Sequence, residues 1–319
     1  MKSKSDKKIV VIGGGTGVFT VLSGLKHYFN NLTAVVTMAD DGGSTGVLRE
    51  EFGILPPGDI RRALIALSSS DNKILSDLFG YRFQEGAGLS GHSFGNLMIT
   101  ALQRITGSFD KAVDEVSRIL AVQGQVIPVT LEKTRLIAEL ADGQVIKGEN
   151  NIDIPQHDGN IKISKIRLSP AAPINPKAKK AIMSADGIVI GPGDLYTSLI
   201  PNLLVRGVKE ALAKTKGKVI YFVNTMTKFG ETNGFQAHDF VNELEQYLGK
   251  KVIDYVVVNK TRPSTMRFKP YVQERSEFVD INPEKLQGAY TAITSNLIRK
   301  YGLIRHDSDK VARMVQLLI

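Results

Sequence analysis

The sequence predicts an α/β protein with a mainly parallel sheet and a small antiparallel hairpin excursion. Three observations support this class. A strand, a glycine turn and a helix open the chain, apolar β-rich runs then recur between helical patterns, and one central stretch changes to strict alternation. At 319 residues with 42% apolar residues, the chain has enough material for a full core, and we expect a single domain over 1–319.

The first forty residues predict a βαβ unit. Residues 8–12 are apolar and β-rich, GGGTG follows, and Val18, Val21, Leu22 and Leu25 recur at helical spacing. A second β-rich run covers 32–37. Strands that are apolar throughout are typical of a parallel sheet, because such a sheet is buried on both faces.

The next segments predict a loop and then helices. Periodicity stops over 38–59, which is rich in Gly, Asp and Pro, and we expect a long functional loop there. Apolar residues three or four apart predict helices over 60–68, 93–105 and 109–120.

Alternation over 125–168 predicts the antiparallel excursion, with Asp142 and Gly143 as its hairpin turn. Three further parallel strands are expected at DGIVI, KVIYFVNT and VIDYVVVN, with helices near 203–214 and 238–248 between them. From about 263 to 319 we expect an extension that ends in a docked helix over 310–319.

Composition limits the function. Cysteine is absent, which excludes disulfides, thiolate zinc sites and a cysteine nucleophile, and suits a reducing compartment. The net charge of +9 is spread along the chain without an aromatic-interleaved basic block, so we expect no nucleic-acid partner. No apolar stretch approaches the roughly 18 residues of a membrane span, and MKSKSDKK reads as a polar tail. We expect a soluble, cytoplasmic protein.

The glycine turn predicts a phosphate site. Its residues are Gly13, Gly14, Gly15, Thr16 and Gly17, at the start of a helix whose N–H groups and dipole favour an anion. Val18 stands where the dinucleotide fingerprint has its third glycine. The alternative is a tight strand-to-helix turn without a ligand.

Polar residues follow the second strand. Asp40 and Asp41, with Gly43 and Ser44 after them, could hold a ribose or a divalent cation, or begin a turn. Asp59 is a candidate N-cap for a helix whose first turn carries Arg61 and Arg62. Arginines there oppose the helix dipole, which indicates a bound anion or else a solvated surface pair.

Two later motifs extend the site. In SGHSFGNL, His92 and Asn96 could face a ligand, with His92 as a general base, or Ser93 could cap the helix with His92 as a packing residue. GPGDLYTSL again follows a strand, so we expect Gly191, Gly193, Asp194, Tyr196 and Thr197 at the same sheet edge as GGGTG, with Asn224 beside them. No G-x-x-x-x-G-K-[ST], H-E-x-x-H or G-x-S-x-G motif is present.

Four motifs in this order, VVIGGGTG, MADDGGSTGVLREEFGILPPGDIRR, GHSFGNL and GPGDLYTSLIPNL, resemble the YvcK-like gluconeogenesis-factor family, which is related to the CofD phospholactate transferases. The resemblance covers about 8–260. It implies a Rossmann-like, three-layer fold in a cytoplasmic bacterial protein that binds UDP-sugars, notably UDP-N-acetylglucosamine, and adjusts carbon flow toward cell-wall precursors and cell shape under gluconeogenic growth.

The resemblance therefore implies a regulator more than a catalyst, with glutamine–fructose-6-phosphate amidotransferase as a protein partner, and we expect a homo-oligomer. No cofactor is expected to be required. The CofD relatives use magnesium near paired aspartates, for which Asp40 and Asp41 are the counterparts, so a CofD-like transferase of phosphorus-containing groups is an alternative. An NAD-dependent oxidoreductase is a further alternative, and NAD or a UDP-sugar could occupy the pocket.

Overall fold

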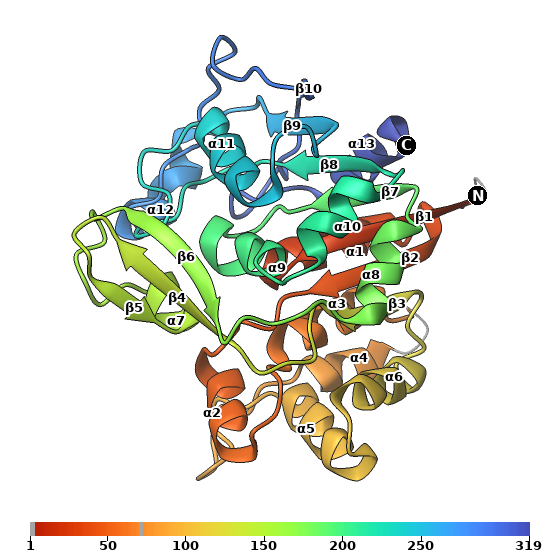
Figure 1. Ribbon diagram of the computed structural model, residues 1–319. Helices are drawn as coiled ribbons and strands as arrows, with labels where there is room; N and C mark the ends of the chain where they lie inside the picture. Colours follow the sequence, from red (N-terminus) through yellow and green to blue (C-terminus); the bar gives the residue numbers. More distant parts are fainter. Residues whose placement is uncertain (1–3, 70–72) are drawn as a thin grey trace.

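A seven-stranded, fully parallel sheet forms the centre of the molecule (Figure 1). The computed structural model describes residues 4–69 and 73–319. The strand order is β10-β9-β8-β7-β1-β2-β3. The strands are β1 (Ser5–Gly13), β2 (Phe29–Val36), β3 (Gln125–Pro128), β7 (Gly187–Ile190), β8 (Lys218–Phe222), β9 (Tyr255–Asn259) and β10 (Thr291–Ser295).

This order is that of a Rossmann fold with one strand added. Counting only the parallel strands along the chain, the order reads 3-2-1-4-5-6-7, and the direction of strand addition reverses between β1 and β7. Ile12 of β1 faces Val35 on one side and Ile190 on the other, and all three are fully buried. The expected α/β class and Rossmann-like fold are confirmed. Ligands of such sheets bind where the order reverses, beyond the carboxyl ends of the strands.

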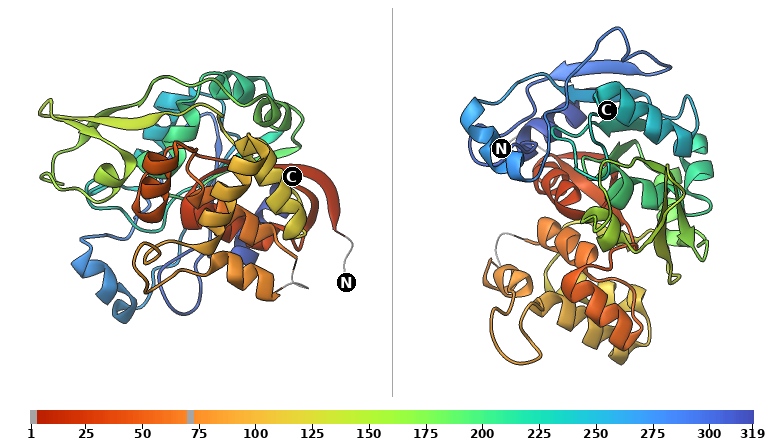
Figure 2. Two further views of the ribbon diagram at one scale, coloured as in Figure 1. Left: turned by 90° about the horizontal axis from the view of Figure 1, so that it is seen from below. Right: turned by 90° about the vertical axis from the view of Figure 1, so that its left-hand side faces the viewer.

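Helices cover both faces of the sheet (Figures 1 and 2). Right-handed crossovers in opposite directions from the reversal point put the two sets on opposite faces. α1 (Gly15–Leu25) packs on α3 (Gly58–Leu67) and α13 (Ser308–Leu318). The other set comprises α8 (Pro176–Met183), α9 (Ile200–Leu203), α10 (Val208–Lys214) and α11 (Ala237–Leu248).

The loop expected over 38–59 is in part helical. α2 (Gly43–Phe52) lies inside it and ends at Gly53, whose φ of +62° is the left-handed conformation of a helix terminus. The helix has only ten residues, and glycines lie at both of its ends. Too few apolar residues fall within it to show a helical period in the sequence. α4 (Lys73–Gly80) was not expected, whereas α5 (Phe94–Thr106) and α6 (Phe109–Ile119) match the expected helices.

The antiparallel excursion is a three-stranded sheet of order β5-β4-β6. It contains β4 (Arg135–Leu140), β5 (Val145–Lys147), the short helix α7 (Glu149–Asp153) and β6 (Ile163–Ser169). Asp142 and Gly143 form the turn between β4 and β5, as predicted. The expected start at Gln125 was wrong, because β3 pairs in parallel with β2 and belongs to the main sheet.

The C-terminal extension completes the main sheet and one helix layer. β10 pairs in parallel with β9, which the polar sequence of this region did not predict. α13 docks on α1, where a Cβ on Gly24 would lie 2.0 Å from the Ser308 carbonyl oxygen. Further helical turns are η2 (Leu195–Leu199), η3 (Thr265–Phe268) and α12 (Lys269–Gln273).

The helix expected near 203–214 is interrupted. α9 ends at Leu203, and Gly207, with a φ of +101°, precedes α10. Residues 1–3 of the expected polar tail lie outside the described residues. Within the described ranges, no helix combines the length and apolarity needed to cross a membrane.

Candidate functional site

A cleft of about 670 Å³ opens where the strand order reverses. The turns after β1 and β7 line it, together with the starts of α2 and α3, residues of α7, and a C-terminal segment around Tyr271 and Leu303 to His306. Three helices, α1, α2 and α3, begin at this cleft, so their positive dipole ends and unpaired N–H groups converge there.

The glycine turn, residues 13–17, packs against the turn that follows β7, residues 191–197, which we call the second turn. A Cβ on Gly17 would lie 1.8 Å from the carbonyl oxygen of Pro192. Gly15 has a φ of +61°, which favours glycine, but a Cβ there would meet only ordinary contacts, with Arg62 Nη1 at 3.6 Å and Ser198 Oγ at 3.7 Å. Glycine at position 17 is thus required by the contact between the two turns, which is a structural cause independent of any ligand.

A carboxylate from α3 lies at the start of α1. Asp59 interacts with the Gly15 N–H and forms an ion pair with Arg62 at 3.6 Å. Burial, then the charge of Asp40, raise the pKa of Asp59 to about 7. The expected N-cap role of Asp59 was wrong. Pro57 occupies the N-cap position. Asp59 is the second residue of α3, and its side chain points to the start of α1.

Asp40 and Asp41 diverge. Asp40 lines the cleft and accepts hydrogen bonds from the Gly42 N–H, at 3.0 Å, and from the Thr45 hydroxyl. Asp41 is turned toward the excursion, where its Oδ1 accepts the N–H of Asn150 at 2.8 Å. Burial raises the pKa of Asp40. The acidic pair within the cleft is therefore Asp40 with Asp59, because adjacent side chains on an extended segment point in opposite directions.

Four polar side chains form a hydrogen-bond chain beside α2. Arg61 Nε donates to Asn96 Oδ1 at 2.9 Å, Asn96 Nδ2 donates to Ser44 Oγ at 3.3 Å, and Ser44 Oγ lies 3.0 Å from His92 Nδ1. Ser93 caps α5, as one of the two sequence interpretations proposed. Arg61, Arg62 and Arg82, the arginine cluster, all line the cleft, and the charges of Arg62 and Arg82 both act on Arg61.

Residues of the second turn lie on two different sides, some at the cleft and some behind it. Gly193 and Asp194 line the cleft with Asn224, whose Oδ1 accepts the Gly193 N–H at 3.3 Å. Tyr196 and Thr197 are buried behind the turn, where the Tyr196 N–H and the Thr197 hydroxyl donate to Glu231. Neither residue lines the cleft, contrary to expectation, since the turn η2 directs Thr197 to Glu231 and the Tyr196 hydroxyl to Glu243 of α11.

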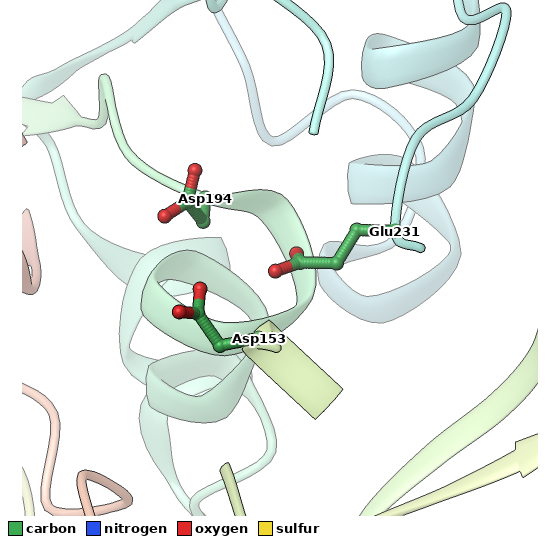
Figure 3. A group of neighbouring side chains, drawn as sticks. All are labelled: Asp153, Asp194 and Glu231. Atoms are coloured by element: carbon green, nitrogen blue, oxygen red, sulfur yellow. The ribbon is translucent and has the colours of Figure 1, made fainter. Parts of the chain in front are cut away.

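Asp153, Asp194 and Glu231, the acidic cluster, point toward one another (Figure 3), with oxygens within 4.8 Å. Lys228 forms an ion pair with Asp153 at 3.0 Å. Burial, then the charges of Asp194 and Asp153, raise the pKa of Glu231 to about 8. Because Lys228 supplies a positive charge and Glu231 already accepts two protein donors, the protein partly balances this cluster itself.

Glu149 connects the charged groups of the cleft. Burial, then Asp40 and the surrounding carboxylates Asp153, Asp59 and Asp41, raise its pKa to about 9. The charged side chains therefore form a continuous series along the cleft. It begins at the arginine cluster, continues through Asp59, Asp40 and Glu149, and ends at the acidic cluster. Arginines gather at one end of the cleft, with Asp59 and Asp40 beside them, and carboxylates gather at the other, with Lys228 and Arg305 near Asp194.

Sequence reasoning missed several cleft residues. They are Arg82, Glu149, Asp153, Lys228, Tyr271, Arg305 and His306. None follows a sheet strand as part of a glycine-rich turn, so no local pattern marks them. His306 is buried, its Nε2 has no partner within the described ranges, and burial lowers its pKa to about 4, so the ring is neutral.

Most of the predicted site residues come together in the cleft, and six do not line it. Those at the cleft are Gly14, Gly15, Thr16, Gly17, Asp40, Gly43, Ser44, Arg61, Arg62, Asn96, Gly193, Asp194 and Asn224. Gly13 is the last residue of β1 and Gly191 directly follows β7, so each precedes the residues of its turn that line the cleft. His92 stands behind Ser44, and Asp41, Tyr196 and Thr197 point elsewhere.

Comparisons with known proteins agree with this architecture. The family model described as 2-phospho-L-lactate transferase CofD matches residues 9–298. A protein of Nostoc sp., provisionally named gluconeogenesis factor, is 49% identical over 313 residues, which cover 97% of this chain and 68% of that protein. The gluconeogenesis factor of Bacillus subtilis is 42% identical over 312 residues and is covered to 96%.

A solved structure has the same fold. The crystal structure of a Bacillus halodurans protein superimposes with a TM-score of 0.93 at 38% identity and covers 98% of this chain and 100% of that chain. The similarity therefore includes the excursion and the C-terminal extension as well as the central sheet.

Proposed function

The chain belongs to the CofD family and is a relative of the gluconeogenesis factors within it, and on this premise we propose that its cleft binds a UDP-sugar and that the bound state regulates carbon flow toward cell-wall precursors. The observation that carries the proposal is the division of charge within one cleft. A volume of about 670 Å³ falls in the range of small-molecule sites.

Each part of a nucleotide sugar finds matching chemistry. The diphosphate requires cations and N–H donors, which Arg61, Arg62 and the starts of α1 and α2 offer. The base can pack on Tyr271, Leu303 and Ile304. Sugar hydroxyls donate to carboxylates, and the acidic cluster presents such acceptors at the other end.

A divalent cation could bind between the arginine cluster and the acidic cluster, at Asp40 and Asp59. Asp40 and Asp59 are carboxylates whose pKa values are raised by burial, and oxygen donors of this kind are those that Mg²⁺ prefers. A bound Mg²⁺ would neutralise charge between these carboxylates and the diphosphate. Asp41 is not part of this proposed set, because its side chain contacts α7.

Regulation requires a protein partner, and we keep glutamine–fructose-6-phosphate amidotransferase as the proposed one, in the cytoplasm and with the chain as a homo-oligomer. The resemblance supports this role, while the cleft chemistry supports only the ligand. The partner is tested separately, by measuring amidotransferase activity with and without the protein at saturating ligand.

A second candidate is phospho-group transfer of the CofD type. The placement of Asp40 and Asp59 beside three helix N-termini favours it, since carboxylates near a phosphate can receive a proton from an attacking hydroxyl. Neither the family match nor the cleft residues described above favour the alternative of an NAD-dependent oxidoreductase.

Calorimetric titration with UDP-N-acetylglucosamine, UDP-glucose and NAD, with and without magnesium, tests the proposal. We expect selective binding of the UDP-sugars, with the ligand recovered intact by chromatography. Consumption of a phosphate donor would make the protein a transferase. Absence of any UDP-sugar binding would contradict the ligand assignment.

A further inference from the structure

The start of α2 is an unoccupied set of hydrogen-bond donors. Gly42 is its N-cap and provides no side-chain cap, and the N–H groups of Gly43, Ser44 and Thr45 have no hydrogen-bond partner in residues 4–69 and 73–319. All four residues line the cleft. The helix has ten residues, so its positive dipole end faces the cleft with three free donors.

Arg61 provides an independent indication of an anion. The residue is only 7% exposed, yet it lines the cleft, and Nε is the only nitrogen of its guanidinium with a hydrogen-bond partner in the described part of the chain. Its nearest charges include Arg62 and Arg82, which repel it, and Asp59 and Asp40, which oppose them. A buried cation with free terminal N–H groups is costly unless an acceptor arrives.

Asn96 joins Arg61 to Ser44 and sets the direction of the hydrogen bonds. A guanidinium has no acceptor, so Asn96 must present Oδ1 to Arg61 and therefore Nδ2 to Ser44. Ser44 Oγ thus accepts from Asn96. One amide holds the guanidinium and the hydroxyl on the same side of the cleft.

The Ser44 hydroxyl can donate its hydrogen to one of two acceptors. It can go to His92 Nδ1, at 3.0 Å, when that nitrogen carries no proton. When His92 carries a proton on Nδ1, Ser44 Oγ accepts from both His92 and Asn96 and directs its own hydrogen into the cleft. An oxyanion in the cleft favours the second arrangement, because it supplies the acceptor.

We propose that the N-terminus of α2, the Ser44 hydroxyl and the Arg61 guanidinium form an oxyanion subsite for a phosphate group, separate from the glycine turn, with His92 as the residue that orients Ser44. The subsite lies in the same cleft as the proposed UDP-sugar and rests on that function for its natural ligand. It deepens the function by assigning a phosphate to α2 rather than to α1.

The glycine turn differs in its charge balance. The Asp59 carboxylate already stands at the Gly15 N–H, so an anion there meets a resident negative charge. At α2 the resident carboxylate is Asp40, which also lines the cleft but accepts the Gly42 N–H and the Thr45 hydroxyl rather than the first N–H groups of the helix. The Ser44 hydroxyl and the Arg61 guanidinium line the same cleft and add donors that the start of α1 lacks. A phosphate is therefore better matched at α2.

Titration of the full chain with inorganic phosphate tests the subsite. In a histidine-¹⁵N-labelled sample, long-range ¹H–¹⁵N spectra report the protonation of each imidazole nitrogen. We expect saturable phosphate binding that moves His92 Nδ1 toward the protonated form. Ser44→Ala and Arg61→Gln should each weaken phosphate binding by about tenfold, as loss of a hydrogen bond to a charged group predicts.

Thr16→Val is the matched control, because it removes a cleft hydroxyl at the glycine turn. It should change phosphate affinity less than about twofold. Thermal unfolding identifies variants that fail to fold, and Ser44→Ala keeps the test valid if Arg61→Gln does. Weakening by Thr16→Val with no effect of Ser44→Ala, or no phosphate binding at all, would overturn the proposal.

UDP-N-acetylglucosamine titrated into the same variants separates the two proposals. If phosphate follows the expected pattern but the UDP-sugar does not bind, the proposed function fails and the subsite stands. If the UDP-sugar binds wild type, Ser44→Ala and Arg61→Gln equally, the subsite fails and the proposed function stands.

Discussion

The two ends of the cleft differ in how far the protein compensates their charges. In the acidic cluster, Lys228 pairs with Asp153, and Glu231 accepts hydrogen bonds from Tyr196 and Thr197. In the arginine cluster, Arg62 pairs with Asp59 and Arg82 donates to the Gly91 carbonyl, but the terminal nitrogens of Arg61 have no hydrogen-bond partner within the described ranges. The difference between the two ends therefore rests on Arg61, whose terminal N–H groups are available to an acceptor.

The same comparison applies to the glycine-rich turns. Gly17 is explained by a backbone contact with Pro192, and Asp59 fills the start of α1. At the start of α2, a Cβ on Gly42 would lie 3.0 Å from the side-chain oxygen of Asn150, whereas a Cβ on Gly43 would meet nothing within 4 Å. Close packing therefore explains Gly17 but not Gly43, so the two glycine-rich segments have different physical causes.

The contact between the turns can be broken by Gly17→Ala. The added Cβ would overlap the Pro192 carbonyl oxygen, a backbone atom that cannot move without shifting the turn. We expect the free energy of unfolding to fall by more than about 2 kcal/mol, measured by urea denaturation. Gly43→Ala, whose Cβ would meet open space at a φ of +44°, is the control and should cost less. Equal stabilities would contradict the packing explanation.

The acidic cluster can be tested through pH. A glutamate has an ordinary pKa of 4.5, and in the fold burial and the charges of Asp194 and Asp153 raise that of Glu231 to about 8, with Lys228 and the Tyr196 N–H opposing. The folded state thus holds a proton that the unfolded state releases. Its stabilisation is complete below the unfolded value and is lost as pH rises through about 8.

Denaturation at a series of pH values measures this effect. In wild type, Glu231 should lower the free energy of unfolding by up to about 1.4 kcal/mol per pH unit as pH rises through this window. Glu231→Gln should flatten that slope. An unchanged slope in the variant would show that Glu231 does not carry the pH dependence.

The proposed cation site between the two clusters is tested by comparing Asp40→Asn with Asp41→Asn. Because Asp40 lines the cleft and Asp41 contacts Asn150, only the first should affect a magnesium-dependent ligand. We expect Asp40→Asn to reduce the enhancement of UDP-sugar affinity by magnesium about tenfold. Asp41→Asn should leave it within about twofold in calorimetry. The reverse ranking would restore Asp41 as a cation ligand.

The smallest effect is expected behind the second turn. The Tyr196 hydroxyl donates to Glu243 on the side of the turn opposite the cleft. Tyr196→Phe should therefore leave UDP-sugar affinity within about twofold, while the free energy of unfolding falls by about 1 kcal/mol. A large loss of affinity with unchanged stability would place Tyr196 at the ligand after all.

The sequence predicted what local patterns encode. The βαβ unit, the turns after β1 and β7 and the hairpin at Asp142 follow from periodicity and turn chemistry. It did not predict that β3 and β10 join the main sheet, because short or polar strands depend on their neighbours for pairing. The brief, glycine-flanked α2 was hidden for a similar reason.

The site was predicted where strand ends determine position and missed where distant segments meet. Ser44 comes shortly after the second strand and Asn96 comes in the first turn of an expected helix, so their place at the cleft could be inferred. Glu149 enters from the excursion and Arg305 from the C-terminal segment, and no local signal places either in the cleft. The direction of Asp41 and Tyr196 depends on single backbone torsions, which a residue pattern does not specify.

A crystal structure of the protein with bound UDP-N-acetylglucosamine tests the division of the cleft most directly. We predict a phosphate within hydrogen-bond distance of Arg61, Ser44 and the first N–H groups of α2, with sugar hydroxyls on Asp153 or Asp194. A ligand whose phosphates lie at the acidic cluster, or one bound outside the cleft, would contradict it.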